Sequence, residues 1–336
     1  MTPTARRAAV GRVAAVAYHA GLTGLACRVA GRGAPRVPIL TYHRVNDERD
    51  PYFPSLPTAV FERQMAYVAR AYRVLPLDEL VDRLGRGDLP ANALAITFDD
   101  GYRDNLTHAA PILARHRLPA TVFLATGFIG TAAVPWFDRI ATAFKTTVAP
   151  SFTAPWGATV PLGSAGERLD AVARSQAYLK TLSHPAFGEQ VHRICEAGGG
   201  RAGEPAKNEM LGWDDVHALR GLGCAIGAHT VSHPILSRMG AEQAAREIGG
   251  SRQMIQASCG FGPRAFAYPN GQPEDYTETT VRLVREAGFD FAVTTRFGMN
   301  GPATPSFELR RGGPSEHHLP TFALKLAWYR LTMGTR

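Results

Sequence analysis

The sequence predicts an α/β protein in which parallel strands and helices form a single (β/α) barrel of about seven strands. Short apolar runs alternate with helical patterns from residue 37 onward, which is typical of βα units around a parallel sheet. The chain has 336 residues, and one barrel of about 250 residues fits within that length. We therefore expect one large core with an N-terminal arm and an insertion between strands.

The first half of the predicted barrel contains four strands and three helices. The strands are short apolar runs, and the first helix carries Phe61, Met65, Val68 and Tyr72 at helical spacing. The expected strands are residues 37–42, 74–75, 94–98 and 120–125, and the expected helices are residues 58–72, 77–84 and 105–115.

A long irregular stretch from about residue 130 to residue 210 separates this half from the next. It is rich in turn residues, contains a helical run from Arg168 to Leu182, and is interpreted as an insertion that caps one face of the core. Alternation then resumes. The expected helices are 213–222, 241–258 and 279–287, and the expected strands are 224–228, 265–267 and 291–294. The barrel is expected to span residues 37–315, and residues 316–336 to form a polar C-terminal tail.

Residues 1–36 are predicted to form a basic helical arm. These residues contain six arginines and no acidic residue: Arg6, Arg7, Arg12, Arg28, Arg32 and Arg36. Such an arm could contact an anionic membrane surface as a peripheral protein, or remain a solvated basic tail. The apolar run from Val13 to Cys27 is diluted by polar residues and glycine, so we expect a packing or surface helix in place of a signal peptide or spanning segment. A cytoplasmic or membrane-peripheral location is favoured over secretion.

Charge and cysteine usage exclude two classes of protein. The formal net charge is +8, but beyond the arm most basic residues have acidic neighbours, so we predict no nucleic-acid partner. The four cysteines, Cys27, Cys195, Cys224 and Cys259, lie far apart without a C-x-x-C pair. This spacing indicates neither a zinc knuckle nor a disulfide framework.

Two adjacent carboxylates, Asp99 and Asp100, follow the apolar strand that ends at Phe98. Catalytic groups of α/β barrels lie at the carboxyl ends of strands. Neighbouring residues point in different directions, so one carboxylate can bind a cation while the other acts as a base. Asp-Asp-Gly is also a common turn sequence, and taken alone this motif would favour a turn.

Two histidines, His229 and His233, follow another short apolar strand. Thr230 and Val231 are β-branched and Pro234 suits the first turn of a helix, so we place both imidazoles on a loop. Together with a carboxylate, two neutral imidazoles form a three-ligand set that leaves metal positions open for water and substrate. Loop histidines alone are more often surface residues. In this chain, however, the histidine pair occurs together with the carboxylate pair Asp99 and Asp100, and the combination favours a metal site.

Two weaker motifs follow other strand ends. His43 ends the first predicted strand and could face the same edge, although an isolated histidine is more often a hydrogen-bonded core residue. Residues 266–271 run from a strand into a turn containing Tyr268, Pro269 and Asn270, whose backbone could border a pocket.

In this order, the motifs resemble those of the polysaccharide deacetylase family, carbohydrate esterase family 4, also called the nodulation-protein-B homology domain. The resemblance covers roughly residues 37–300 and rests on Thr97-Phe98-Asp99-Asp100-Gly101 and His229-Thr230-x-x-His233-Pro234. It implies a distorted (β/α) barrel of about seven strands. It also implies that Asp99 is the general base and that Asp100, His229 and His233 bind Zn²⁺ or a similar divalent metal.

Two departures from the family pattern affect the site. The third family motif usually reads Arg-x-Pro-Tyr, but Ala267 and Asn270 occupy its first and last positions; Arg264, Arg310 or Arg311 could replace the arginine. The usual late Leu-x-His motif, which carries the general acid, is also missing. A permuted subgroup, the poly-N-acetylglucosamine deacetylases, carries this histidine in an early Tyr-His motif, and His43 matches it.

The resemblance implies a metal-dependent hydrolase that removes N-acetyl groups from an amino-sugar polysaccharide or oligosaccharide, with bacterial exopolysaccharides among the candidates. The metal would polarise a water and the acetamide carbonyl, Asp99 would take the proton of the water, and His43 would protonate the departing amine. The expected substrate-binding residues are Tyr102, Tyr268, Pro269 and Asn270, with a backbone N–H near Gly101 or Tyr102 helping to hold the oxyanion.

Two alternative functions remain open from the sequence. A hydrolase on the same scaffold could act on an O-acetyl ester or a cyclic amide, because the fold does not dictate the acyl group. The missing motif arginine also allows a carbohydrate-binding module with a degenerate site.

Overall fold

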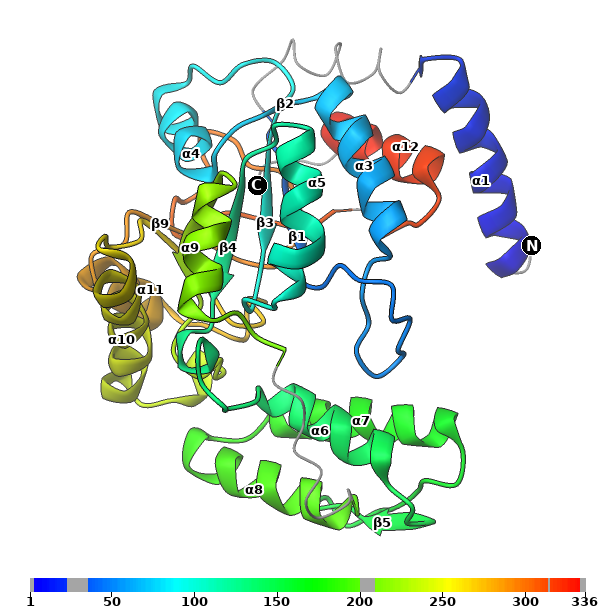
Figure 1. Ribbon diagram of the computed structural model, residues 1–336, viewed down its shortest axis with the longest axis vertical. Helices are drawn as coiled ribbons and strands as arrows, with labels where there is room; N and C mark the ends of the chain where they lie inside the picture. Colours follow the sequence, from blue (N-terminus) through cyan, green and yellow to red (C-terminus); the bar gives the residue numbers. More distant parts are fainter. Residues whose placement is uncertain (1–2, 23–35, 200–208, 314, 333–336) are drawn as a thin grey trace.

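A computed structural model describes residues 3–22, 36–199, 209–313 and 315–332. Its centre is a curled sheet of seven parallel strands that forms a half-barrel, with helices around it (Figure 1). This confirms the predicted distorted barrel of about seven strands. Cys27 and part of the basic arm lie outside the described residues, as do residues 200–208 of the predicted insertion and residues 333–336 of the predicted tail.

The strands follow the predicted alternation closely. Their order in the sheet is β1-β3-β4-β7-β8-β9, and β2 also pairs with β3. β3 and β4 are buried along their whole length, as expected of continuous apolar runs in a parallel sheet. The bounds are β1 (Ile39–Tyr42), β2 (Arg73–Val74), β3 (Ala93–Phe98), β4 (Ala120–Leu124), β7 (Cys224–Ala228), β8 (Ala265–Ala267) and β9 (Phe291–Val293).

The barrel helices bury the apolar stripe that their sequences predict. In α3 (Thr58–Ala71), for example, Phe61, Met65 and Val68 enter the core. The remaining helices are α4 (Leu77–Arg86), the π-helical turn η1 (Asn105–Ala109), α5 (Ala110–Arg115), α9 (Trp213–Gly221), α10 (Ala241–Cys259) and α11 (Glu278–Glu286). Two single turns, η2 (Thr126–Phe128) and η3 (Leu236–Arg238), follow β4 and the histidine loop.

The predicted insertion contains more regular structure than its composition indicates. It holds α6 (Trp136–Thr146), a hairpin of β5 (Ser151–Thr153) and β6 (Thr159–Pro161), α7 (Ala165–Leu179) and α8 (His184–Ala197). These elements share a hydrophobic cluster that includes Ile140, Phe144, Phe152 and Ile194. The insertion therefore has a small core of its own, next to the carboxyl ends of the barrel strands (Figure 1).

The two terminal helices lie side by side at the edge of the molecule (Figure 1). They are α1 (Pro3–His19) and α12 (Leu319–Thr332). The expectation of a polar C-terminal tail was wrong for α12, because Phe322, Ala323, Leu326 and Ala327 form one buried face. No helix in the described part of the chain is long and apolar enough to span a membrane.

An extended segment, residues 309–312, lies between the two edges of the curled sheet. The Leu309 N–H donates to the Ala292 carbonyl in β9, and the Gly312 N–H donates to the Ile39 carbonyl in β1, both at 3.0 Å. The segment thus connects the first and last strands of the sheet path and carries Arg311 into the barrel interior.

Candidate active site

Several polar side chains lie at the carboxyl ends of neighbouring strands. Tyr42 in β1 pairs with Phe98 in β3, so His43 and Asp99 follow strand ends in the same register. Ala228 ends β7 opposite Leu124, and His229 comes next. Parallel strands end at one edge of the sheet, and this edge collects the residues that the sequence analysis singled out.

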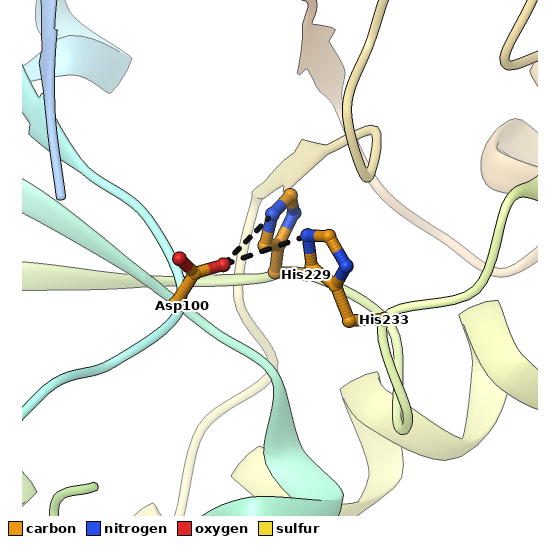
Figure 2. Close-up of side chains that lie close together, drawn as sticks. All are labelled: Asp100, His229 and His233. Atoms are coloured by element: carbon orange, nitrogen blue, oxygen red, sulfur yellow. Dashed lines mark ion pairs between the residues drawn. The ribbon is translucent and has the colours of Figure 1, made fainter. Parts of the chain in front are cut away.

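Asp100, His229 and His233 form a compact group of potential metal ligands. One ligand atom from each residue lies within 4.8 Å of the other two. The Nε2 atoms of His229 and His233 are 3.7 and 3.5 Å from Oδ1 of Asp100. Figure 2 shows both imidazole rings turned toward this single oxygen. The structure therefore brings together the three residues expected to share a metal, across 129 positions of sequence between Asp100 and His229.

The backbone of this group is strained. Asp100, Thr230 and His233 have φ angles of 72°, 65° and 56°, in the left-handed region that residues with a side chain seldom adopt. Such conformations cluster at functional sites, where surrounding contacts hold them in place. Here they turn the carboxylate and the imidazoles toward one another.

The histidine loop is held by the barrel on both sides. Nδ1 of His229 lies 2.8 Å from the carbonyl oxygen of Ala267, which leaves Nε2 free to face Asp100. The Glu247 carboxylate of α10 accepts hydrogen bonds from the backbone N–H groups of Val231 and Ser232, at 2.9 and 2.8 Å. A carbonyl on the second ring nitrogen is the usual support of a metal-binding histidine, because it fixes the tautomer.

Burial favours a neutral His233 imidazole and leaves one oxygen of Asp100 without a hydrogen-bond partner among the described residues. Burial lowers the pKa of His233 well below its ordinary value, with the His229 charge adding to the effect, so its imidazole is neutral and can donate a lone pair. Burial also raises the pKa of Asp100, and Oδ1 of Asp100 has no hydrogen-bond partner within the described chain. A buried, unpartnered carboxylate oxygen facing two imidazoles fits a bound divalent metal, which would satisfy all three atoms.

Asp99 is bound by Arg311 through two parallel hydrogen bonds. Nη1 and Nη2 of Arg311 donate to Oδ1 and Oδ2 of Asp99, each at 2.7 Å, and both side chains are buried. Arg311 also donates to the Thr97 hydroxyl at 3.1 Å and to the Thr294 carbonyl at 3.0 Å. Burial alone would raise the pKa of Asp99, but the Arg311 charge and hydrogen bonds bring that pKa below its ordinary value.

The other two candidate arginines lie elsewhere. Arg264 pairs with Asp82 at 2.9 Å, and its remaining ion-pair partners are Asp78 and Asp290. The side chain of Arg310 lies beside Gly298. Among the three arginines that the sequence left open, the structure therefore pairs Arg311 with Asp99.

A cavity of about 820 Å³ opens above these residues. Its floor includes Asp99, Asp100, His229 and His233, and its walls come from the barrel loops and from the insertion. The insertion contributes Trp136, Phe137 and Asp138 from α6 and Leu169, Val172, Ala173, Gln176 and Lys180 from α7 and the residue after it. The volume lies within the usual range of ligand-binding pockets, about 300–1,000 Å³.

The sequence of this chain matches a known protein family. The family model described as polysaccharide deacetylase matches residues 86–292, more than half of the chain. The chain belongs to the polysaccharide deacetylase family. Polysaccharide deacetylases are hydrolases, so the protein is an enzyme of that class.

Solved structures of other polysaccharide deacetylases share this fold. A deacetylase of Streptococcus pyogenes, PplD in complex with acetate, is 20% identical, covers 87% of this chain and 98% of its own, and has a TM-score of 0.59. IcaB of Ammonifex degensii is also 20% identical, covers 89% of this chain and 97% of its own, and has a TM-score of 0.58. At this level of identity the likeness shows the fold.

One curated protein is also similar in sequence. YxkH of Bacillus subtilis strain 168, assigned as a polysaccharide deacetylase, is 32% identical over 97 residues, which are 28% of this chain and 34% of YxkH. The chain thus matches about a third of the length of this relative.

The remaining residues predicted for the deacetylase site divide into two groups. His43, Tyr102 and Asn270 line the cavity. The expectation that Tyr268 borders the substrate was wrong for its side chain, which is wholly buried and stacks on Tyr276 with ring centroids 4.5 Å apart. Pro269 is buried as well and does not line the cavity. The turn after β8 directs its apolar side chains into the core and presents only Asn270 to the cavity.

Two features of the cavity were missed from the sequence. His317, just beyond the predicted barrel, lines the cavity together with His43. The first turn of α6 reaches the site, where the Tyr102 hydroxyl donates to Asp138 at 3.0 Å. Trp136, Ile140 and Phe144 recur every fourth residue, which was a signal for α6, but nothing in that pattern indicates which residues it meets.

Proposed function

We propose that this protein is a divalent-metal-dependent deacetylase that removes N-acetyl groups from an amino-sugar polysaccharide or oligosaccharide. The observation that carries the proposal is the convergence of Asp100, His229 and His233 beside a separate carboxylate, Asp99, on the floor of one cavity. Family membership supports the deacetylation reaction. The N-acetyl specificity and the residue roles are proposals.

The donor set favours Zn²⁺ over harder cations. Two imidazole nitrogens and one carboxylate oxygen suit zinc and related transition metals, whereas magnesium and calcium prefer oxygen ligands. A divalent ion bound there supplies Lewis-acid polarisation of the acyl group and lowers the pKa of a water to about 7. We therefore assign Asp100, His229 and His233 as the ligands.

Asp99 is proposed as the general base. Arg311 keeps its carboxylate ionised and fixes its plane, yet each oxygen retains a lone pair after accepting one hydrogen bond. The carboxylate can take a proton from the attacking water as the water adds to the acetamide carbon. The backbone N–H of Tyr102 is proposed to stabilise the developing oxyanion.

His43 is proposed as the general acid. It follows β1, lines the same cavity, and its charge acts on both Asp99 and Asp100. When the carbon–nitrogen bond breaks, protonation by His43 would release the sugar amine, leaving acetate as the second product. Tyr102 and Asn270 are proposed to contact the sugar.

The Arg311 contact weakens the case for a degenerate binding module. That alternative depended on the missing motif arginine, and a buried arginine is now paired with the proposed base. The other alternative is hydrolysis of an O-acetyl ester or a cyclic amide on the same scaffold. Activity measured on each kind of substrate distinguishes it from N-deacetylation.

The test is acetate release from N-acetylated and O-acetylated oligosaccharides, with chitooligosaccharides, peptidoglycan fragments and bacterial exopolysaccharides as the panel. The wild type should release acetate from an N-acetylated member when Zn²⁺ is present. Asp100→Asn should lose both zinc and activity, whereas Asp99→Asn should keep zinc and lose turnover. Full activity of Asp99→Asn, or release from O-acetylated substrates alone, would contradict the proposal.

A further inference from the structure

The first turn of α6 lies directly against the proposed metal site. The indole N–H of Trp136 donates to the His233 carbonyl at 3.2 Å. The Phe137 ring meets the His233 imidazole edge to face, with centroids 5.2 Å apart and an interplanar angle of 74°. Both residues come from the insertion, about 100 positions before His233. The insertion therefore contacts a proposed ligand as well as the substrate cavity.

The two histidines differ in how their second ring nitrogen is supported. Nδ1 of His229 lies 2.8 Å from the Ala267 carbonyl. Nδ1 of His233 is buried, and no atom of the described residues forms a hydrogen bond with it. A metal-binding histidine ordinarily has such a partner, which fixes the orientation of its ring. His233 also has a φ of 56°, a conformation that requires support from its surroundings.

We propose that Trp136 and Phe137 are positioning residues for His233, and that they replace the missing hydrogen bond to its second ring nitrogen. Trp136 anchors the strained backbone of His233, and Phe137 limits rotation of the imidazole, so that Nε2 keeps facing Asp100. Trp136 is itself packed against Phe187 of α8, with ring centroids 5.2 Å apart. The proposal rests on the proposed function, because it assumes that His233 binds the metal.

Metal affinity separates this role from substrate binding. Phe137 also lines the cavity, so a role limited to sugar contact would change KM and leave zinc binding unaltered. A positioning role predicts weaker zinc binding in the absence of any substrate. The measurement is isothermal titration of Zn²⁺ into the purified, metal-free, full-length chain, with thermal melts to verify that each variant is folded.

Phe137→Ala should bind zinc about 10- to 100-fold more weakly than the wild type, as is typical when support around a ligand is lost. Trp136→Phe keeps an aromatic ring at this position but removes the indole N–H, and should also weaken zinc binding. Phe137→Leu retains apolar volume and should fall between Phe137→Ala and the wild type. Leu169→Ala is the matched control: it shortens another apolar side chain that lines the cavity from the insertion, and it should bind zinc as the wild type does.

Unchanged zinc affinity in folded Phe137→Ala and Trp136→Phe would overturn the inference while leaving the proposed function intact. If Phe137→Ala does not fold, Phe137→Leu and Trp136→Phe decide the question by the same criterion. A wild-type chain that binds no zinc, or an Asp100→Asn variant that binds it equally well, would overturn the proposed function and this inference together.

Discussion

Arg311 and Asp99 form a buried, bidentate ion pair that joins residues 212 positions apart in the chain. The arginine comes from the segment that lies between the first and last strands of the sheet path, so formation of the pair depends on closure of the barrel. An arginine was expected at position 267 from the family resemblance, but this chain has alanine there, and the guanidinium that pairs with Asp99 comes from Arg311.

Arg311→Met should impair both stability and turnover. Removal of one partner leaves Asp99 as an unpaired buried charge, which costs about 3–5 kcal/mol in comparable ion pairs. Burial then dominates and raises the pKa of Asp99, so less of the proposed base is ionised. Urea denaturation and acetate release measure the two effects.

Arg310→Met is the control, and Arg311→Lys, which keeps the charge but loses the bidentate geometry, should retain more stability. Wild-type stability and activity in Arg311→Met would refute the role of this pair.

The sequence predicted the barrel, and it singled out three residues, Asp100, His229 and His233, that the structure places close together, because strands and strand-end motifs are local patterns. Buried parallel strands are continuous apolar runs, and Asp100 and His229 each follow such a run. The partner of Asp99 could not be chosen among Arg264, Arg310 and Arg311, because barrel closure and not local sequence decides which one points inward. The contacts of Trp136 and Phe137 with His233 were equally inaccessible, because they depend on how the insertion packs on the barrel.

His43 and His317, the cavity-lining histidines outside the proposed metal group, should differ in their effect on catalysis. His43→Ala should lower kcat by roughly 10²- to 10⁴-fold, the usual contribution of a general acid. His317→Ala should have a much smaller effect, because it is proposed only to border the cavity. Steady-state kinetics on the best substrate of the panel make the comparison. The reverse result, a large loss of kcat only in His317→Ala, would contradict the role of His43 and would assign the general acid to His317.

Asp138 should make the metal-free protein less stable as the pH rises. Burial raises the pKa of Asp138 from 3.8 to about 7, with nearby Asp100 and Glu209 charges adding to the shift. The folded state therefore keeps a proton that the unfolded state has lost, and stability falls between about pH 4 and pH 7. Asp138→Asn, which can still accept from Tyr102, should gain more than about 1 kcal/mol relative to wild type between pH 5 and pH 8. An unchanged difference in unfolding free energy across this range would contradict the assignment.

The terminal helices should bind anionic membranes. Among the described residues, six of the eight exposed large apolar side chains lie on or next to α1 and α12: Val13, Val16, Leu22, Phe297, Trp328 and Leu331. No acidic residue occurs before Asp47, and α12 contains Lys325, which is partly exposed, but no acid. Apolar side chains in a cationic setting favour an anionic lipid surface.

Vesicle co-sedimentation measures this interaction. Binding should require anionic lipid, weaken with salt, and decrease in the double variant Val16→Ser with Trp328→Ser. Val148→Ser, which removes an exposed apolar side chain from the distant insertion, is the control. Equal sedimentation of the wild type and the double variant would exclude this surface as the membrane contact.

The most direct test of the account is anomalous diffraction at the zinc absorption edge from a crystal of the zinc-loaded enzyme. The account predicts one strong peak at about 2.0–2.2 Å from Nε2 of His229, Nε2 of His233 and an oxygen of Asp100. No peak at these three residues, or a peak coordinated elsewhere in the cavity, would contradict the proposed metal site and the mechanism built on it.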